Sequence, residues 1–349
     1  MDMDKATKRK EKILQVVISH YVRTAKPVAS GVIVKEYGFP FSSATVRNVL
    51  AELEEEGYLT HPYTSAGRIP TDKGYRFYVD GLMEAARLTK EEERRIEREY
   101  RDNRGGLEET MRQTSKMLSL FSHYAGFILS PILDRSSLKH MELVRIGAKR
   151  VLVLLVTEAG LVKDRTIELN YDLKGSQVYK ISSLLNKKLI GLPLSQIREK
   201  MNEIIEQESN KYLYLLKVAK GLITQAFAPG ESEIYLEGSA NILAFIQEYA
   251  KDYARVNSIF RAIEEKRIIL DIVRGLAKSD GVKVLIGKEN LYPEMEHLSV
   301  VSSPYRAGNR IAGALGIIGP KRMEYPKMVA LVDFVANLIN NILNSAEGG

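Results

Sequence analysis

The chain has 349 residues and a mass of 39.3 kDa, which is long enough for two or three domains with separate cores. The absence of cysteine excludes disulfides and cysteine-based metal sites. The charged start shows no signal peptide, and no apolar run approaches the ~20 residues that cross a bilayer, so we expect a cytoplasmic protein. The net charge of +7 favours an anionic partner without identifying it, and residues 1–80 hold twelve basic against ten acidic side chains.

Two short helices are predicted at the start of the chain. Over residues 8–24, apolar side chains recur at the i, i+3, i+4 spacing of a helix with one buried face. Pro27 ends this segment, and a second helix is predicted over residues 29–37. Gly38 follows it at the position where a left-handed turn most easily ends a helix. The pattern is a helix, a tight connection and a second helix.

A third helix is predicted from Ser42 or Ser43, which are good N-cap residues, to Gly57. At about 100° per residue its apolar residues gather on one face, and its small and polar residues gather on the opposite face. The apolar set is Val46, Val49, Leu50 and Leu53, and the outer set is Ala44, Arg47, Asn48 and Ala51.

The outer face has the residue types that read a major groove. The two alanines allow close approach to the bases, Arg47 can bind a guanine edge through two hydrogen bonds, and Asn48 can do the same with adenine. Free N–H groups at the helix start, with the hydroxyls of Ser42, Ser43 and Thr45, suit a phosphate. A solvated surface helix is the alternative for this segment taken alone.

A β-hairpin is predicted directly after the third helix, with strands at residues 58–60 and at Ile69. Its tip holds Thr64 and Ser65, which could donate to phosphate oxygens, and Arg68, which we expect to reach a minor groove or a phosphate. A helix-turn-helix followed by a hairpin is typical of a winged helix. We therefore predict a winged helix-turn-helix DNA-binding domain over residues 1–82; the alternative is a signalling module that uses this fold as a protein interface.

The remaining chain alternates between strand-rich and helical regions. A charged helix with a capping box at residues 89–92 is predicted to form a linker over residues 83–106, before a pair of glycines. Strand-like segments flank a largely helical block, which is the pattern of an insertion. The predicted boundaries are 107–172 and 277–349 for one discontinuous domain and 173–276 for the inserted domain. The apolar stripe over residues 259–272 fits either a core within one chain or a dimer interface.

No catalytic or cofactor site is predicted. The five histidines lack ligand spacing, so no metal is expected. The glycines of residues 313–319 fit a turn better than a phosphate loop, and no serine lies in a Gly-x-Ser-x-Gly elbow. We therefore expect no enzyme and no cofactor.

Several runs of residues carry a specific resemblance that extends to both ends of the chain. The matching runs are Ser43–Asn48, Leu53-Glu54, Gly57–Leu59, Thr64–Thr71, Gly74–Val79, Ile286–Asn290, Leu298–Val301 and Gly316–Met323. In these runs the chain resembles the HrcA family of bacterial heat-inducible transcription repressors. It departs from the family pattern at Tyr63, where histidine is expected.

The resemblance implies an α+β multidomain fold with an N-terminal winged helix-turn-helix and a GAF-like α/β domain, interrupted by a largely helical inserted dimerisation domain. It implies a homodimer that represses chaperone operons by binding an inverted repeat called CIRCE, with activity supported by the chaperonin GroEL. GAF-like folds often hold small ligands, but no pocket can be argued from this sequence, and a small-molecule effector is not expected.

Overall fold

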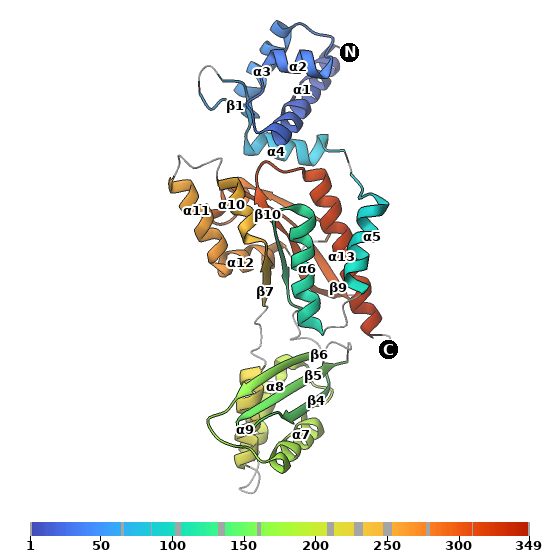
Figure 1. Ribbon diagram of the computed structural model, residues 1–349, viewed down its shortest axis with the longest axis vertical. Helices are drawn as coiled ribbons and strands as arrows, with labels where there is room; N and C mark the ends of the chain where they lie inside the picture. The colour runs from blue at the N-terminus through green and yellow to red at the C-terminus, as the bar shows by residue number, and fades with distance from the viewer. Residues whose placement is uncertain are drawn as a thin grey trace.

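The molecule is elongated, with three bodies in a row (Figure 1). We call them the N-terminal unit (residues 2–82), the central body and, at the other end, the distal body (residues 138–226). The computed structural model describes residues 2–63, 66–84, 86–101, 106–131, 137–158, 162–207, 213–226, 233–246, 253–276, 280–308 and 310–347.

Three helices and a two-stranded hairpin form the N-terminal unit, followed by a short fourth helix and a π-helical turn. Its elements are α1 (Asp2–Thr24), α2 (Ser30–Tyr37), α3 (Ser43–Glu55), β1 (Leu59–Thr60), β2 (Ile69–Pro70), α4 (Asp72–Phe77) and η1 (Tyr78–Leu82). The predicted helix ends are confirmed at two places. Gly38 ends α2 with a φ of 60°, and the Ser42 side chain accepts a hydrogen bond from the backbone N–H of Thr45 at the start of α3.

The core of the N-terminal unit lies where α1, α2 and α3 meet. From α3 it takes Val46, Val49, Leu50 and Leu53, the predicted apolar face, and each is at most 4% exposed. From α1 it takes Ile13, Leu14, Val17 and Ile18. Burying four aliphatic side chains on one face fixes which side of α3 points outward.

The central body is a five-stranded antiparallel sheet, in the order β7-β3-β10-β9-β8, between two layers of helices. The helices α6 and α13 cover one face, and α10, α11 and α12 cover the other (Figure 1). The strands are β3 (Ala125–Leu129), β7 (Ile234–Glu237), β8 (Lys283–Ile286), β9 (Leu298–Ala307) and β10 (Arg310–Pro320). The helices are α5 (Lys90–Arg101), α6 (Leu107–Ser122), α10 (Ser239–Ile246), α11 (Tyr253–Glu264), α12 (Lys266–Leu276), α13 (Tyr325–Glu347) and the 3-10 turns η4 (Gly287–Glu289) and η5 (Pro293–Met295).

The distal body is a three-stranded antiparallel sheet, β4-β5-β6, whose described helices pack on one face. Its elements are β4 (Leu138–Arg145), β5 (Arg150–Thr157), β6 (Val162–Glu168), α7 (Gly175–Leu189), α8 (Leu194–Gln207) and α9 (Leu213–Ala226). Burial alternates along β5, where Val151, Val153 and Leu155 face the helices. The chain enters this body after β3 and leaves it before β7, which is the neighbour of β3 in the central sheet.

The packing corrects the predicted boundaries of the insertion, although it confirms a mixed α and β multidomain chain. Strands β4–β6 were predicted to belong with the flanking domain, but they pack with α7–α9 in a separate core. Residues 234–276 were predicted to be inserted, but β7 joins the central sheet and α10–α12 cover it. The apolar stripe over residues 259–272 is buried against the sheet of its own chain. Strand character in a sequence does not say which sheet a strand joins.

The charged segment before α6 also differs from its prediction. The expected helix over residues 83–104 begins only at Lys90, because the capping box starts it there: Glu92 N–H donates to Thr89 Oγ1 at 3.2 Å, and Thr89 N–H donates to Glu92 Oε2 at 2.9 Å. Ile96 of this helix is fully buried in the core that includes α6 and α13. Helix α5 is thus part of the central body rather than a free linker.

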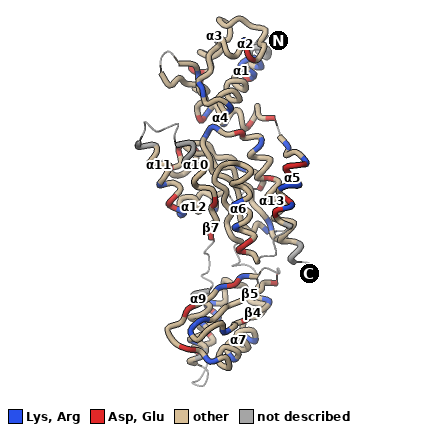
Figure 2. Tube along the Cα trace, viewed as in Figure 1, with Lys and Arg blue, Asp and Glu red and all other residues tan. Residues whose placement is uncertain are grey.

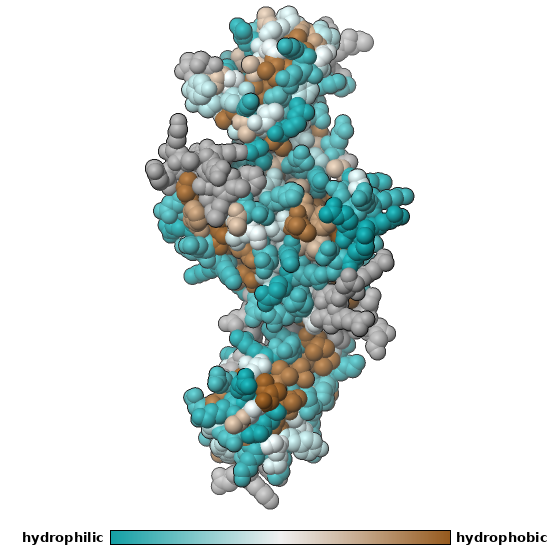
Figure 3. All heavy atoms as spheres, viewed as in Figure 1, coloured by the Kyte–Doolittle hydropathy of each residue, from teal (hydrophilic) through white to brown (hydrophobic). Residues whose placement is uncertain are grey.

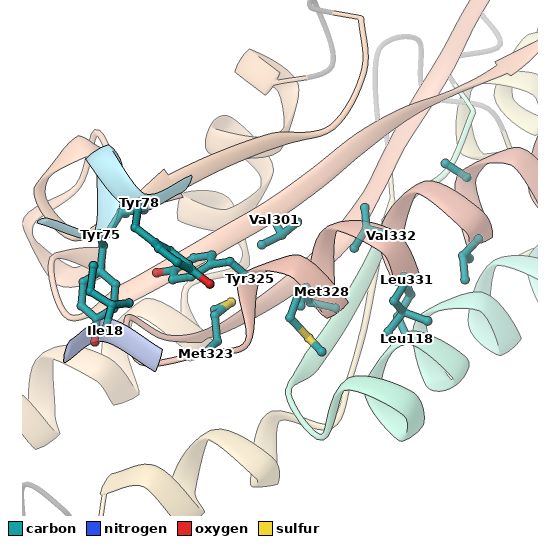
Figure 4. Close-up of a cluster of buried hydrophobic side chains, with 14 of the residues drawn as sticks. Ile18, Tyr75, Tyr78, Leu118, Val301, Met323, Tyr325, Met328, Leu331 and Val332 are labelled. Atoms are coloured by element: carbon teal, nitrogen blue, oxygen red, sulfur yellow. The ribbon is translucent and has the colours of Figure 1, made fainter. Parts of the chain in front are cut away.

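Helix α13 is long and apolar enough over Tyr325–Asn344 to cross a membrane, and it is the one such helix among the residues described. Its apolar side is buried in the core, where Leu331, Val332 and Val335 are at most 1% exposed. Core packing accounts for its composition. This core continues into the N-terminal unit through Tyr75 and Tyr78 (Figure 4).

Candidate nucleic-acid interface

Helix α3 lies in the part of the N-terminal unit beyond α4, away from the central body (Figure 1). Ala44, Arg47 and Asn48 are exposed on its outer face, and Ala51 is half-buried at the edge of that face. Arg47 and Asn48 make no hydrogen bond or ion pair with any residue that the structure describes. A guanidinium and an amide held on a rigid helix without partners are free to form paired hydrogen bonds with base edges.

The hydroxyl groups at the start of α3 differ in their engagement. Ser42 Oγ accepts from Thr45 N–H at 3.1 Å and lies 3.0 Å from Thr45 Oγ1, so these two hydroxyls cap the helix and remain near its surface. Ser43 Oγ instead lies 2.9 Å from Ser30 Oγ, where it joins α3 to α2. Ser42 and Thr45 therefore remain at the start of α3, whereas the hydroxyl of Ser43 is engaged with α2.

The hairpin is short and is tied to the connection between α1 and α2. Strands β1 and β2 pair through Leu59–Pro70 and Thr60–Ile69, and the return strand also exchanges two backbone hydrogen bonds between Val28 and Arg68, at 2.8 and 2.9 Å. A side chain on Gly67 would place its Cβ 2.6 Å from the Val28 carbonyl carbon, so only glycine permits this approach. The predicted phosphate contacts Thr64 and Ser65 lie outside the described residues.

Arg68 is engaged within the protein. Instead of extending from the hairpin tip, its guanidinium binds Glu54 of α3 through Nη2 and Oε2 at 2.7 Å, and its side chain is 25% exposed. Glu54 also contacts Nδ1 of His61 on the hairpin. The sequence pattern could not show this pair, because the two residues are 14 positions apart and meet only when the hairpin folds back onto α3.

At the acidic end of α3, basic side chains from neighbouring elements pair with Glu52, Glu54 and Glu56. Lys10 of α1 lies 2.8 Å from both Glu52 and Glu56, and its hydrogen bonds to them raise the pKa of Lys10 to about 12. Arg68 covers Glu54 in the same way. Both signs of charge are scattered over the whole molecule (Figure 2). The face of α3 that holds Arg47 therefore presents a positive charge that has no partner among the described residues, while three of the four glutamates that would repel phosphate are paired.

The described residues hold no group of three His, Asp or Glu side chains that could bind a metal ion. The chemistry on this surface is hydrogen bonding and charge.

The comparisons with known proteins agree with one family over nearly the whole chain. The family model described as "HrcA protein C terminal domain" matches residues 108–329, which is more than half of the chain. Two similar curated proteins are both named "Heat-inducible transcription repressor HrcA". The one from Geobacter sulfurreducens is 38% identical over 341 residues, covering 98% of this chain and 99% of that protein. The one from Syntrophobacter fumaroxidans is 38% identical over 344 residues and covers 98% of each.

A solved structure supports the fold. A crystal structure of a protein described as hypothetical superimposes with a TM-score of 0.67 at 22% identity, over 97% of this chain and 98% of the other. The names of the curated relatives indicate regulation of transcription rather than catalysis. Taken together, the matching family model and the full-length relatives show that the chain belongs to the HrcA family of heat-inducible transcription repressors.

Proposed function

We propose that the N-terminal unit is a winged helix-turn-helix in which α3 is the recognition helix. The observation that carries this proposal is the outer face of α3, where Arg47 and Asn48 are exposed and unpartnered above a buried aliphatic seam. Arg47 and Asn48 read base edges in the major groove, with Ser42, Thr45 and the start of α3 on the backbone phosphates. Ala44 and Ala51 permit close approach.

The hairpin lies beside this face and supplies the wing. Thr64 and Ser65 are proposed phosphate contacts. Arg68 reaches the DNA only if its guanidinium exchanges Glu54 for a phosphate, which is a replacement of one anion by another. Repression follows from occupation of the promoter.

The repressor acts as a homodimer, because two α3 helices about 34 Å apart match the two halves of an inverted repeat. The proposed dimer surface is the uncovered face of the distal sheet. Along β5 the residues Leu152, Leu154 and Val156 alternate with the buried set and remain partly exposed, and Val144 of β4 and Val162 of β6 are 39% and 43% exposed. Figure 3 shows an apolar band across this body. An apolar sheet face of this kind is typical of a protein interface.

The test of the dimer surface uses one substitution on each face of the distal body. Leu154→Lys puts a charge in the centre of the apolar band, whereas Tyr179→Lys changes an exposed residue on α7 that is 73% exposed. Sedimentation velocity is expected to give a monomer for Leu154→Lys and a dimer for Tyr179→Lys. A dimer in both variants would place the interface elsewhere.

The test of DNA recognition compares a labelled duplex that carries an inverted repeat with a scrambled duplex of equal composition, at physiological salt. Specific binders gain about 10³-fold or more over random sites. A preference of less than about tenfold would favour the alternative, in which the winged helix is a protein interface.

We extend the proposal to the CIRCE inverted repeat as operator and to the chaperonin GroEL as modulator, on the family resemblance. The central body is the proposed GAF-like domain. We further propose that heat acts on the folding or solubility of the repressor itself. Operator affinity measured with and without chaperonin over a range of temperatures tests this; an affinity independent of both, in fully soluble protein, would refute it.

A further inference from the structure

Three sequence runs that the DNA-binding face does not use meet at one place in the fold. Helix α4 holds the first, β8 with the turn η4 holds the second, and the end of β10 with the following turn holds the third. These segments are up to 250 residues apart in the sequence but lie together at the contact between the N-terminal unit and the central body (Figure 1). We call this contact the α4 clamp; its charged members are Asp72, Arg76, Glu289 and Lys321.

Asp72 forms one half of the clamp. Its Oδ1 lies 2.5 Å from Nζ of Lys321, and its Oδ2 accepts a hydrogen bond from the backbone N–H of Lys288 at 3.1 Å. The carboxylate fits against Gly287, whose φ of 54° is in the left-handed region. A side chain on Gly287 would place its Cβ 2.6 Å from Asp72 Cγ. The turn is thus shaped so that a carboxylate from another body can reach its backbone.

Arg76, one turn later on α4, forms the other half. Its Nε donates to Glu289 Oε1 at 2.8 Å, and its Nη2 donates to the Val284 carbonyl at 2.6 Å. Hydrogen bonds to Glu289 raise the pKa of the Arg76 guanidinium further above its ordinary range. Glu289 Oε2 also accepts from the backbone N–H of Ile286 at 2.9 Å, so the residue that binds Arg76 is itself fixed to its own turn.

Apolar contacts surround these ion pairs. The rings of Tyr75 and Tyr325 lie 5.9 Å apart and are both buried, with Met323 beside them (Figure 4). Arg322 donates to the Val22 carbonyl of α1 at 2.9 Å. Asn290 makes the loop rigid by donating to the carbonyl of Gly287 at 2.8 Å and to that of Leu298 at 3.2 Å.

The chain segment that joins the two bodies constrains their relative orientation less than the α4 clamp does. Between η1 and α5 the described residues of the segment 83–89 form neither helix nor strand. Met83 and Leu88 of this segment pack against the core, but a segment without regular structure constrains orientation less than the ion pairs and backbone hydrogen bonds of the clamp.

We propose that Asp72, Arg76, Glu289 and Lys321 are positioning residues for operator binding, which hold α3 at one orientation on the central body so that the dimer accepts one half-site spacing and rejects others. This inference rests on the proposed function. A rigid dimer loses no further conformational entropy when it binds a repeat of matching spacing. It cannot place both α3 helices on a repeat whose second half-site is turned to the opposite side of the DNA.

The experiment titrates the full-length protein against three probes: an inverted repeat of the best spacing, the same repeat with five base pairs added to the spacer, and a duplex with a single half-site. The key variant is Gly287→Ala, because it expels the Asp72 carboxylate without altering any residue of the N-terminal unit. The control is Arg112→Ala, which removes an exposed ion pair with Glu108 on α6.

Wild type and Arg112→Ala are expected to prefer the best spacing by about tenfold or more. In Gly287→Ala this preference should fall below about threefold, while affinity for the single half-site stays within about twofold of wild type. The single variants Arg76→Glu and Glu289→Arg should behave like Gly287→Ala, because each removes the ion pair and also loses a backbone partner, the Val284 carbonyl for residue 76 and the Ile286 N–H for residue 289. A merely structural contact would lower affinity for all three probes together.

Two failures are distinguishable. A wild type that does not prefer the repeat over scrambled DNA overturns the proposed function and this inference with it. A wild type that discriminates both sequence and spacing, with unchanged spacing preference in Gly287→Ala and in both single charge reversals, overturns the clamp alone. If Gly287→Ala also loses the single half-site, the two single charge reversals decide: a wild-type spacing preference in both overturns the inference.

Discussion

Helices α3 and α4 belong to the same small unit and both carry an arginine on a polar face, yet their side chains are used in opposite ways. Arg47 of α3 is exposed and has no partner among the described residues. Arg76 of α4 is bound by two groups of the central body. Free polar side chains on a rigid helix are available to a partner, whereas engaged ones hold the structure.

Two sides of the N-terminal unit therefore differ in whether their polar side chains are exposed or engaged. One side offers hydrogen-bonding groups that have no partner among the described residues, and the other side is held by the central body. Substitutions on the two sides should therefore have different effects on stability and on DNA binding.

The largest effect on stability and binding is expected from the buried apolar face of α3, which is formed by Val46, Val49, Leu50 and Leu53. Leu50 is 4% exposed, so Leu50→Ala should lower the free energy of unfolding by about 2–5 kcal/mol and abolish binding to specific and random DNA alike. Thermal unfolding followed by circular dichroism measures it. Leu120→Ala, at a residue 55% exposed on α6, is the matched control and should change stability by less than about 0.5 kcal/mol.

Removing the free side chains should affect recognition without affecting stability. Arg47→Ala and Asn48→Ala should each cost about 1–3 kcal/mol in binding to the operator, with discrimination relaxed at one base position. Fluorescence anisotropy with operator variants measures this, and Arg112→Ala should leave it unchanged. Equal weakening on specific and random duplexes would mean that the residue contacts phosphate instead.

The pair Arg68–Glu54 lies between the two classes, since it is engaged in the free protein but close to the DNA-binding face. Glu54→Gln releases the guanidinium, so affinity for DNA should rise about two- to fivefold, an effect of roughly 0.5–1 kcal/mol. In Arg68→Ala the slope of log affinity against log salt should fall by about one unit. If the double variant keeps the gain of Glu54→Gln, the gain comes from lost acidic charge and not from Arg68.

The smallest effect concerns Glu92, an engaged side chain within the central body. Hydrogen bonds from the Thr89 backbone and from Lys327 lower the pKa of Glu92 to about 2. Since the folded pKa is below the unfolded value of about 4.5, the stabilisation is fully present above pH 4.5 and is lost as the pH falls toward 2. Glu92→Gln should cost about 0.5 kcal/mol at pH 6 and less at pH 3, as measured by urea unfolding. A cost that grows toward acid would contradict this origin.

Much of the candidate interface could be predicted from the sequence because it depends on local periodicity. All four residues of the predicted seam of α3 are buried, and Ala44, Arg47 and Asn48 lie on the outer side. The hydroxyl of Ser43 could not be placed in the same way, because its partner Ser30 belongs to another helix.

The sequence alone determined the three helices and their caps, the hairpin after them, the family resemblance and the face of α3 that is left outside. These follow from interactions between residues a few positions apart. Only the tertiary structure decided that Arg68 meets Glu54, that β4–β6 form a sheet of their own, that α11 and α12 cover the central sheet, and that Asp72 and Arg76 are held by Glu289 and Lys321. The physical reason is that contacts between distant segments are set by how whole faces pack, and a local pattern specifies a face without specifying what will cover it.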